Sequence, residues 1–259
     1  NPVTGDQVAM TNHHWKFSIN ALREGLGVSR FLLLNDFTAL ALSLTLLPEA
    51  QKRQVGSGTA TPNAAIGLIG PGTGLGVSGL FPVGYQNKWI PIAGEGGHVS
   101  LTATTEHEFA AIQQLQKRYG HVSAERVISG AGLVDLYHAL CDLKDGQGRE
   151  ITTPAEVIER AQEVPTSTAN EALDMFCGFL GSVAGDLALT LGARGGIYIG
   201  GGIVPRLAER FDASPFRERF EAKGRFKKYL QDVPTWVIHS PVSPALQGAS
   251  QALSLTQWQ

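Results

Sequence analysis

Two neighbouring polar residues, Asn35 and Asp36, follow the apolar run 31–34. A carboxylate at the end of a buried strand can take a proton from a substrate hydroxyl. The Asn35 amide can hold a neighbouring hydroxyl. Open α/β sheets place their ligand sites at this end of a strand. The pair is therefore a candidate for catalysis on a hydroxyl group, and the alternative is that Asp36 caps the helix expected over 37–47.

A glycine-rich segment, GPGTGLG, occupies residues 70–76 and is expected to form the tip of a β-hairpin. It has no Lys-Ser/Thr ending and no following helix, so it is neither a P-loop nor a dinucleotide fingerprint. Backbone N–H groups around Gly72, Thr73 and Gly74 can nevertheless converge on a phosphate. A hairpin turn that only needs positive φ is the alternative without a ligand.

Glu95 and His98 are separated by two glycines, so both side chains can turn toward one pocket. Planar donors and acceptors of this kind recognise sugars. The two could instead be zinc ligands, although the chain has no cysteine cluster to complete a tetrahedral site. A surface turn with a satisfied histidine is the third interpretation.

Glu125 follows Ser123, which resembles an N-cap, so the helix dipole alone explains an acidic residue there if a helix spans 123–129. The Gly200-Gly201-Gly202 turn follows an apolar strand and permits close approach of a flat ligand, or tight packing of a helix on a sheet. The basic stretch 217–228 alternates with acidic and aromatic residues. That pattern favours a solvated helical face over a nucleic-acid site.

The elements that would position these residues alternate between strands and helices, which indicates an α/β fold. A capping box with Pro154 at the first helical position marks one helix start. Residues 51–63, rich in Gly, Ser, Thr and Pro, form the best candidate linker. Strands are expected at 31–34, 65–69, 77–81, 196–199 and 235–239, and helices at 37–47, 106–119, 123–129, 133–140, from 153, 169–191, 203–211 and 244–253.

Composition excludes several classes of protein. With 43% hydrophobic and 17% charged residues the 259-residue chain is not disordered, and its formal charge of −2 argues against a basic nucleic-acid face. Two cysteines, Cys141 and Cys177, are too few for a disulfide scaffold. The apolar stretch 172–191 contains two aspartates and is expected to be a buried helix, with no membrane span. No secretory signal opens the chain, so we expect a cytoplasmic protein.

The order of the motifs resembles the bacterial glucokinase family of the hexokinase-like, actin-like ATPase superfamily. The motifs are Asn-Asp, Gly-Thr-Gly-Leu-Gly, Gly-Glu-Gly-Gly-His, Ser-Ala-Glu-Arg-Val and Gly-Gly-Gly-Ile-Val-Pro-Arg. The resemblance runs from residues 2–6 and 10–13 to 224–227. It implies the actin-like (ribonuclease H-like) two-domain α/β fold and ATP-dependent phosphorylation of D-glucose at its 6-hydroxyl, with Mg²⁺ bridging the phosphates.

The resemblance also implies a role for each candidate residue. Asp36 corresponds to the catalytic base. Asn35, Glu95, His98 and Glu125 correspond to ligands of the glucose hydroxyls. The resemblance assigns the nucleotide to two glycine turns, Gly72, Thr73 and Gly74 on the phosphate side and Gly200, Gly201 and Gly202 on the adenosine side.

One family motif, the Asp-x-Gly-Gly-Thr-Asn phosphate loop, does not occur in these 259 residues. We therefore expect an incomplete small domain, formed by 1–47 and completed by about 237–259, beside a large domain over 48–236. We also expect this chain alone to phosphorylate glucose poorly. The family suggests a homodimer.

Three alternatives stand beside the glucokinase interpretation. A ROK-type sugar kinase or repressor shares the Glu and His of the sugar turn, but typically carries a cysteine-rich zinc motif. A non-catalytic sugar-sensing module would keep the binding residues without turnover. An actin-like assembly protein, a further class, would need no sugar contacts.

Overall fold

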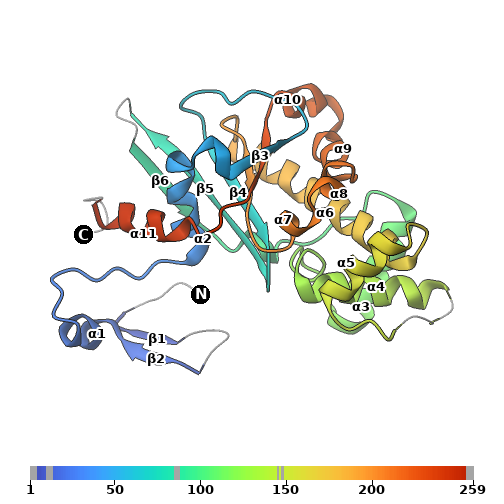
Figure 1. Cartoon of the computed structure of the whole chain (residues 1–259), viewed down its shortest axis with the longest axis horizontal. Coiled ribbons are helices and arrows are strands. Elements are labelled where there is room, and N and C mark those ends of the chain that lie inside the picture. The colour runs from blue at the N-terminus through green and yellow to red at the C-terminus, as the bar shows by residue number, and fades with distance from the viewer. Residues whose placement is uncertain (1–4, 10–13, 85–87, 145, 147–148, 255–259) are drawn as a thin grey trace.

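A computed structural model describes residues 5–9, 14–84, 88–144, 146 and 149–254. Residues 2–4 and 10–13 of the resemblance, and 255–259 of the expected small domain, lie outside these ranges. The centre of the fold is a six-stranded sheet in the order β3-β8-β7-β4-β5-β6 (Figure 1). The strands are β3 (Lys52–Val55), β4 (Ile66–Pro71), β5 (Leu75–Val83), β6 (Lys88–Ala93), β7 (Ile197–Ile199) and β8 (Thr235–Ile238).

The middle of the sheet is parallel, since β7 pairs in parallel with both β4 and β8. The flanking pairs β4–β5, β5–β6 and β3–β8 are antiparallel. Every residue of β4 and β7 is buried, which fits the continuous apolar composition of strands covered on both faces. The carboxyl ends of β4 and β7 therefore lie together at one edge of the sheet.

Helices cover both faces of the sheet (Figure 1). On one face α2 (Asp36–Ser43) packs against α11 (Ala245–Ser254) and against β5 and β6. On the other, α6 (Thr168–Leu191) packs against β4 and α9 (Phe216–Glu221). Two hydrophobic cores result, one on each side of the sheet.

The remaining elements extend this body. They are β1 (Gln7–Ala9), β2 (Lys16–Ser18), α1 (Ile19–Gly25), α3 (Glu106–Tyr119), α4 (Gly130–Lys144), α5 (Pro154–Glu163), α7 (Val204–Leu207), α8 (Glu209–Asp212), α10 (Lys227–Gln231) and four 3₁₀ turns at 44–46, 49–51, 96–98 and 224–226. The antiparallel pair β1–β2 and α1 lie apart from the sheet, and α3, α4 and α5 gather at one end of α6 (Figure 1).

Local sequence signals place most of these elements where they were expected. The capping box at Thr153 and Glu156 starts α5, and a second box at Thr105 and Glu108 starts α3. The α6 helix is long and apolar enough to cross a membrane by length and composition, yet 72% of its most apolar window is buried inside the structure. It is the expected buried helix. The division into 1–47 with 237–259 and 48–236 stays a prediction.

Four expectations about elements are wrong. Residues 31–34 form no strand, because none of the described strands lies beside them to share hydrogen bonds. Residues 52–55 of the expected linker are strand β3, paired with β8. Residues 123–129 form turns without a helix. The helix expected over 203–211 is divided at Ala208, whose φ of 45° is not helical.

Candidate active site

Asn35 and Asp36 stand at the start of α2. Asn35 is the N-cap, and its Oδ1 accepts hydrogen bonds from the N–H groups of Phe37 at 2.9 Å and Thr38 at 3.1 Å. Asp36 is the first helical residue, is exposed, and also accepts from the Phe37 N–H through Oδ1 at 2.9 Å. Capping therefore belongs to Asn35, not to Asp36. The Asn35 amide can donate, and the second Asp36 oxygen can accept, toward a substrate hydroxyl.

The glycine-rich segment forms the expected hairpin, with residues 72–74 joining β4 to β5. The Gly72 N–H donates to Gly74 O within the tip, and the Gly130 N–H at the start of α4 donates to Gly72 O, both at 2.8 Å. None of the glycines at 70, 72, 74 and 76 has a positive φ. The interpretation that the turn only needs positive φ is therefore wrong. The close approach of other groups explains glycine at 70, 74 and 76, whereas a Cβ on Gly72 would meet open space.

Glu125 is one of the groups that approach the tip. Its Oε2 accepts a hydrogen bond from the Leu75 N–H at 2.8 Å, and a Cβ added to Gly74 would lie 2.5 Å from that oxygen. Because residues 123–129 form turns, the helix dipole does not explain Glu125. The carboxylate instead binds the base of the hairpin tip.

The turn that carries Glu95 and His98 lies against the same hairpin. Gly97 is buried, a Cβ there would overlap the Leu75 carbonyl oxygen, and Gly97 O accepts from the Glu125 N–H at 2.8 Å. The exposed His98 ring has its Nδ1 4.0 Å from Glu125 Oε1. Glu125 thus faces the hairpin tip with one oxygen and the expected sugar turn with the other.

The third turn, Gly200–Gly202, follows β7 at the same edge of the sheet. The Gly200 N–H donates to Ile69 O at 2.8 Å, and Gly201 has a φ of +79°. A Cβ on Gly201 would overlap the Pro71 carbonyl oxygen, so close packing requires this glycine. The turn also lines a groove of ≈390 Å³. A cavity of ≈610 Å³ beside α10 is lined by none of the candidate residues.

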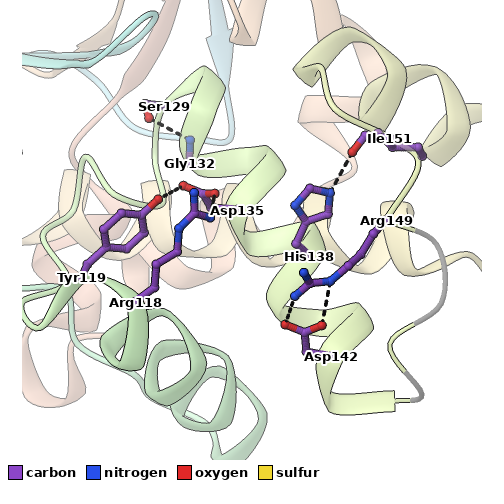
Figure 2. A network of polar contacts seen from close by, with 9 residues as sticks. All are labelled: Arg118, Tyr119, Ser129, Gly132, Asp135, His138, Asp142, Arg149 and Ile151. Carbon is purple, nitrogen blue, oxygen red and sulfur yellow. Dashed lines mark hydrogen bonds and ion pairs between the residues drawn. The ribbon is translucent and has the colours of Figure 1, made fainter.

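A network of side chains that no sequence pattern predicted supports the loop that carries Glu125. Arg126 lies over the Tyr119 ring at 4.3 Å, and Tyr119 donates through its hydroxyl to Asp135 at 2.5 Å. Figure 2 shows Asp135 held by both Tyr119 and Arg118. Burial, together with the bond to Asp135, raises the pKa of the Tyr119 hydroxyl. Tyr119 therefore donates as a neutral phenol.

Ser129 secures the same loop at its other end. Its Oγ donates to Glu125 O at 2.8 Å and accepts from the Gly132 N–H at 3.1 Å (Figure 2 shows the second bond). Ser129 is only 3% exposed. The backbone of Glu125 is thereby tied to the first turn of α4.

Part of the basic stretch 217–228 is not a solvated face. Arg217 and Arg219 are half-buried, and Arg219 forms a two-pronged ion pair with the buried Glu108, one prong at 3.2 Å. Arg219 also donates to Ser182 at 3.0 Å, so it joins α3, α6 and α9. Within the ranges that the structure describes, no group of three His, Cys, Asp or Glu side chains is placed to hold a metal ion.

Comparison with known proteins defines the class first. The structure is similar to that of a glucokinase from an Antarctic psychrotroph, with a TM-score of 0.87 and 34% identity over 98% of this chain and 78% of that one. A ROK family glucokinase from Streptomyces griseus, solved with glucose and AMPPNP, shares the fold at a TM-score of 0.60 and 17% identity, over 91% of this chain and 71% of that one. The fold is that of the actin-like ATPase class of sugar kinases.

The family follows from the sequence comparisons. The Glucokinase family profile matches residues 1–256. Glucokinase of Chromobacterium violaceum is 54% identical over 98% of this chain and 72% of its own length. The bifunctional protein glk of Paraburkholderia xenovorans is 51% identical over 98% of this chain. The matched region covers only 39% of that longer protein. The chain belongs to the glucokinase family.

Proposed function

We propose that this protein transfers the terminal phosphoryl group of ATP to the 6-hydroxyl of D-glucose. The observation that carries the proposal is the position of Glu125. One of its oxygens binds the Leu75 N–H below the hairpin tip, and the other faces His98 in the turn that also holds Glu95. The residues proposed to bind the sugar and the turn proposed to bind the phosphates are therefore neighbours, as transfer between the two substrates requires.

The sugar would be held by charged acceptors and amide or ring donors. Glu95 and Glu125 would accept from glucose hydroxyls, and His98 and the Asn35 amide would complete the set. Hydrogen bonds to charged groups contribute about 1.5–3 kcal/mol each, so two carboxylates would dominate the affinity.

Asp36 would act as the base. Its Oδ1 is held by the Phe37 N–H, which orients the carboxylate. The second oxygen can take the proton of the 6-hydroxyl as that oxygen attacks the phosphorus. Phosphoryl transfer depends mainly on alignment and charge stabilisation, and a fixed base at a helix start meets the first requirement.

ATP would lie along the edge of the sheet where β4 and β7 end. The tip residues Gly72, Thr73 and Gly74 would face its phosphates, and the groove beside Gly200, Gly201 and Gly202 would take the adenosine. Mg²⁺ usually binds through phosphate oxygens with one or two carboxylates, and the exposed Asp36 could supply one of them. When bound, Mg²⁺ would neutralise charge on the phosphates.

We also propose how active residues 1–259 are, where the protein is located and how it assembles. Residues 1–259 by themselves phosphorylate glucose poorly, because the Asp-x-Gly-Gly-Thr-Asn motif that completes the family's phosphate site does not occur in them. The protein is a cytoplasmic enzyme of glycolysis and a homodimer.

The test compares residues 1–259 with an extended chain, in which the same residues follow a segment that supplies the Asp-x-Gly-Gly-Thr-Asn motif. Glucose binding is measured by calorimetry and glucose 6-phosphate by a coupled assay with ATP and Mg²⁺. The proposal expects glucose binding by both chains and rapid turnover by the extended one. An extended chain that binds glucose without turnover would favour the sensing module, and one that neither binds nor phosphorylates glucose would refute the substrate assignment.

A further inference from the structure

Two glycines face each other across the hairpin, one residue pair before its tip. Gly70 of β4 and Gly76 of β5 are partners in the antiparallel register, and the next pair, Pro71 and Leu75, carries residues 72–74. Neither glycine has a positive φ, so the backbone conformation does not require glycine at either place. Another group must exclude side chains there.

That group is the ring of Phe37. A Cβ on Gly76 would overlap ring atoms Cδ2 and Cε2, and a Cβ on Gly70 would lie 2.6 Å from Cζ. The two glycines thus form a slot that one aromatic ring fills. Leu40, one turn further along α2, approaches the neighbouring turn in the same way, because a Cβ on Gly200 would lie 3.0 Å from its Cδ2.

The slot fixes the start of α2 to the hairpin. Asp36 and Phe37 are consecutive, and the Phe37 N–H also donates to the side chains of Asn35 and Asp36 at 2.9 Å. Asp36 is exposed while the Phe37 ring is half-buried, so the ring forms the anchor and the carboxylate remains available to a substrate.

We propose that Phe37 is a positioning residue that sets the Asp36 carboxylate relative to the phosphate-binding tip, and that Gly70 and Gly76 are glycines in order to admit its ring. This inference rests on the proposed function. It predicts that disturbing the slot slows phosphoryl transfer while glucose binding largely persists, because the proposed glucose ligands other than Asn35, namely Glu95, His98 and Glu125, lie on other segments of the chain. A misplacement of about 1 Å can slow a reaction about 100-fold.

The test uses the extended chain with Phe37→Leu, Gly76→Ala and the double variant. Gly76 is chosen over Gly70 because a Cβ on Gly70 would also lie 2.8 Å from the Gly200 carbonyl carbon. Phe109→Leu is the matched control, since Phe109 is 56% exposed on α3. For each variant kcat, the KM for glucose, calorimetric glucose affinity and thermal unfolding are measured.

We expect each single substitution to lower kcat about 10- to 100-fold while the KM and affinity for glucose change less than about threefold. Because both act on one contact, the double variant should be no slower than the slower single variant, whereas independent effects would multiply. Phe109→Leu should match the wild type.

Each contrary result has a distinct meaning. If the unsubstituted extended chain makes no glucose 6-phosphate, the proposed function fails and the role of Phe37 fails with it. If that chain is active and Phe37→Leu has the kcat of Phe109→Leu, only the positioning role is overturned. If Phe37→Leu and Gly76→Ala lose glucose binding along with kcat, or their effects multiply, the ring is merely part of the packing and the inference is also overturned.

Discussion

Replacing Glu125 separates the two tasks that the structure gives to its carboxylate. Glu125→Gln keeps an oxygen that can accept from the Leu75 N–H, but it removes the charge and places an amide toward His98. Glu125→Ala removes the charge and both acceptor oxygens. Comparing the two substitutions therefore distinguishes binding of the sugar from support of the hairpin.

The magnitudes follow from the contacts. A hydrogen bond to a charged group contributes about 1.5–3 kcal/mol and a neutral one about 0.5–1.5, so Glu125→Gln should lower the free energy of unfolding by about 1 kcal/mol. Glu125→Ala leaves the N–H of Leu75, a residue only 5% exposed, without its acceptor, at a cost of about 1–3 kcal/mol. Loss of the charged acceptor should weaken glucose binding roughly 10- to 150-fold in both variants.

Calorimetric titration with glucose and chemical denaturation measure these quantities on residues 1–259. Glu159→Gln is the control, because it removes the same charge at an exposed position in the interior of α5. Glucose affinity in Glu125→Gln equal to that of the control would refute the role of Glu125 in sugar binding. Unchanged stability in Glu125→Ala would refute its role in holding the hairpin.

Two further predictions concern packing, one between helices α3, α6 and α9 and one at the Gly200–Gly202 turn. Arg219→Met should lower the free energy of unfolding by about 3–5 kcal/mol at neutral pH, because it leaves the buried Glu108 without its ion-pair partner. Burial raises the pKa of Glu108, but hydrogen bonds from Arg219 and the Thr104 backbone outweigh burial and hold it below its usual value of 4.5. The difference between Arg219→Met and wild type should therefore shrink as the pH falls below that value, which denaturation at several pH values checks; a constant difference would contradict the assignment. Gly201→Ala should lower the free energy of unfolding by at least about 1–2 kcal/mol and raise the KM for ATP in the extended chain. The reason is that residue 201 has a positive φ and that an added Cβ would overlap the Pro71 carbonyl oxygen. Gly25→Ala is the control and should do neither, because a Cβ there would meet open space.

Signals that act over short stretches of sequence predicted the elements well. The capping box at Thr153 places the start of α5. The apolar periodicity of 106–119 and 169–191 places α3 and α6. The hairpin at 70–76 and the turn at Gly96–His98 also follow from glycine spacing. These features depend on the local chain alone.

Features that depend on distant partners could not be predicted. An apolar run such as 31–34 becomes a strand only if another strand lies beside it, and 52–55 became one because β8 does. The Phe37 ring excludes a side chain at 70 and 76, and no local pattern reveals that contact. The support of Glu125 by Tyr119, Asp135 and Ser129 likewise emerges only in three dimensions.

The central claim is that Asp36 is the base that activates a glucose hydroxyl, and Asp36→Asn in the extended chain tests it most directly. Asparagine keeps an oxygen that can accept from the Phe37 N–H, so the start of α2 should be preserved. We predict that kcat for glucose falls by at least about 100-fold while calorimetric glucose affinity stays within about threefold of wild type. A kcat close to that of wild type would contradict the account.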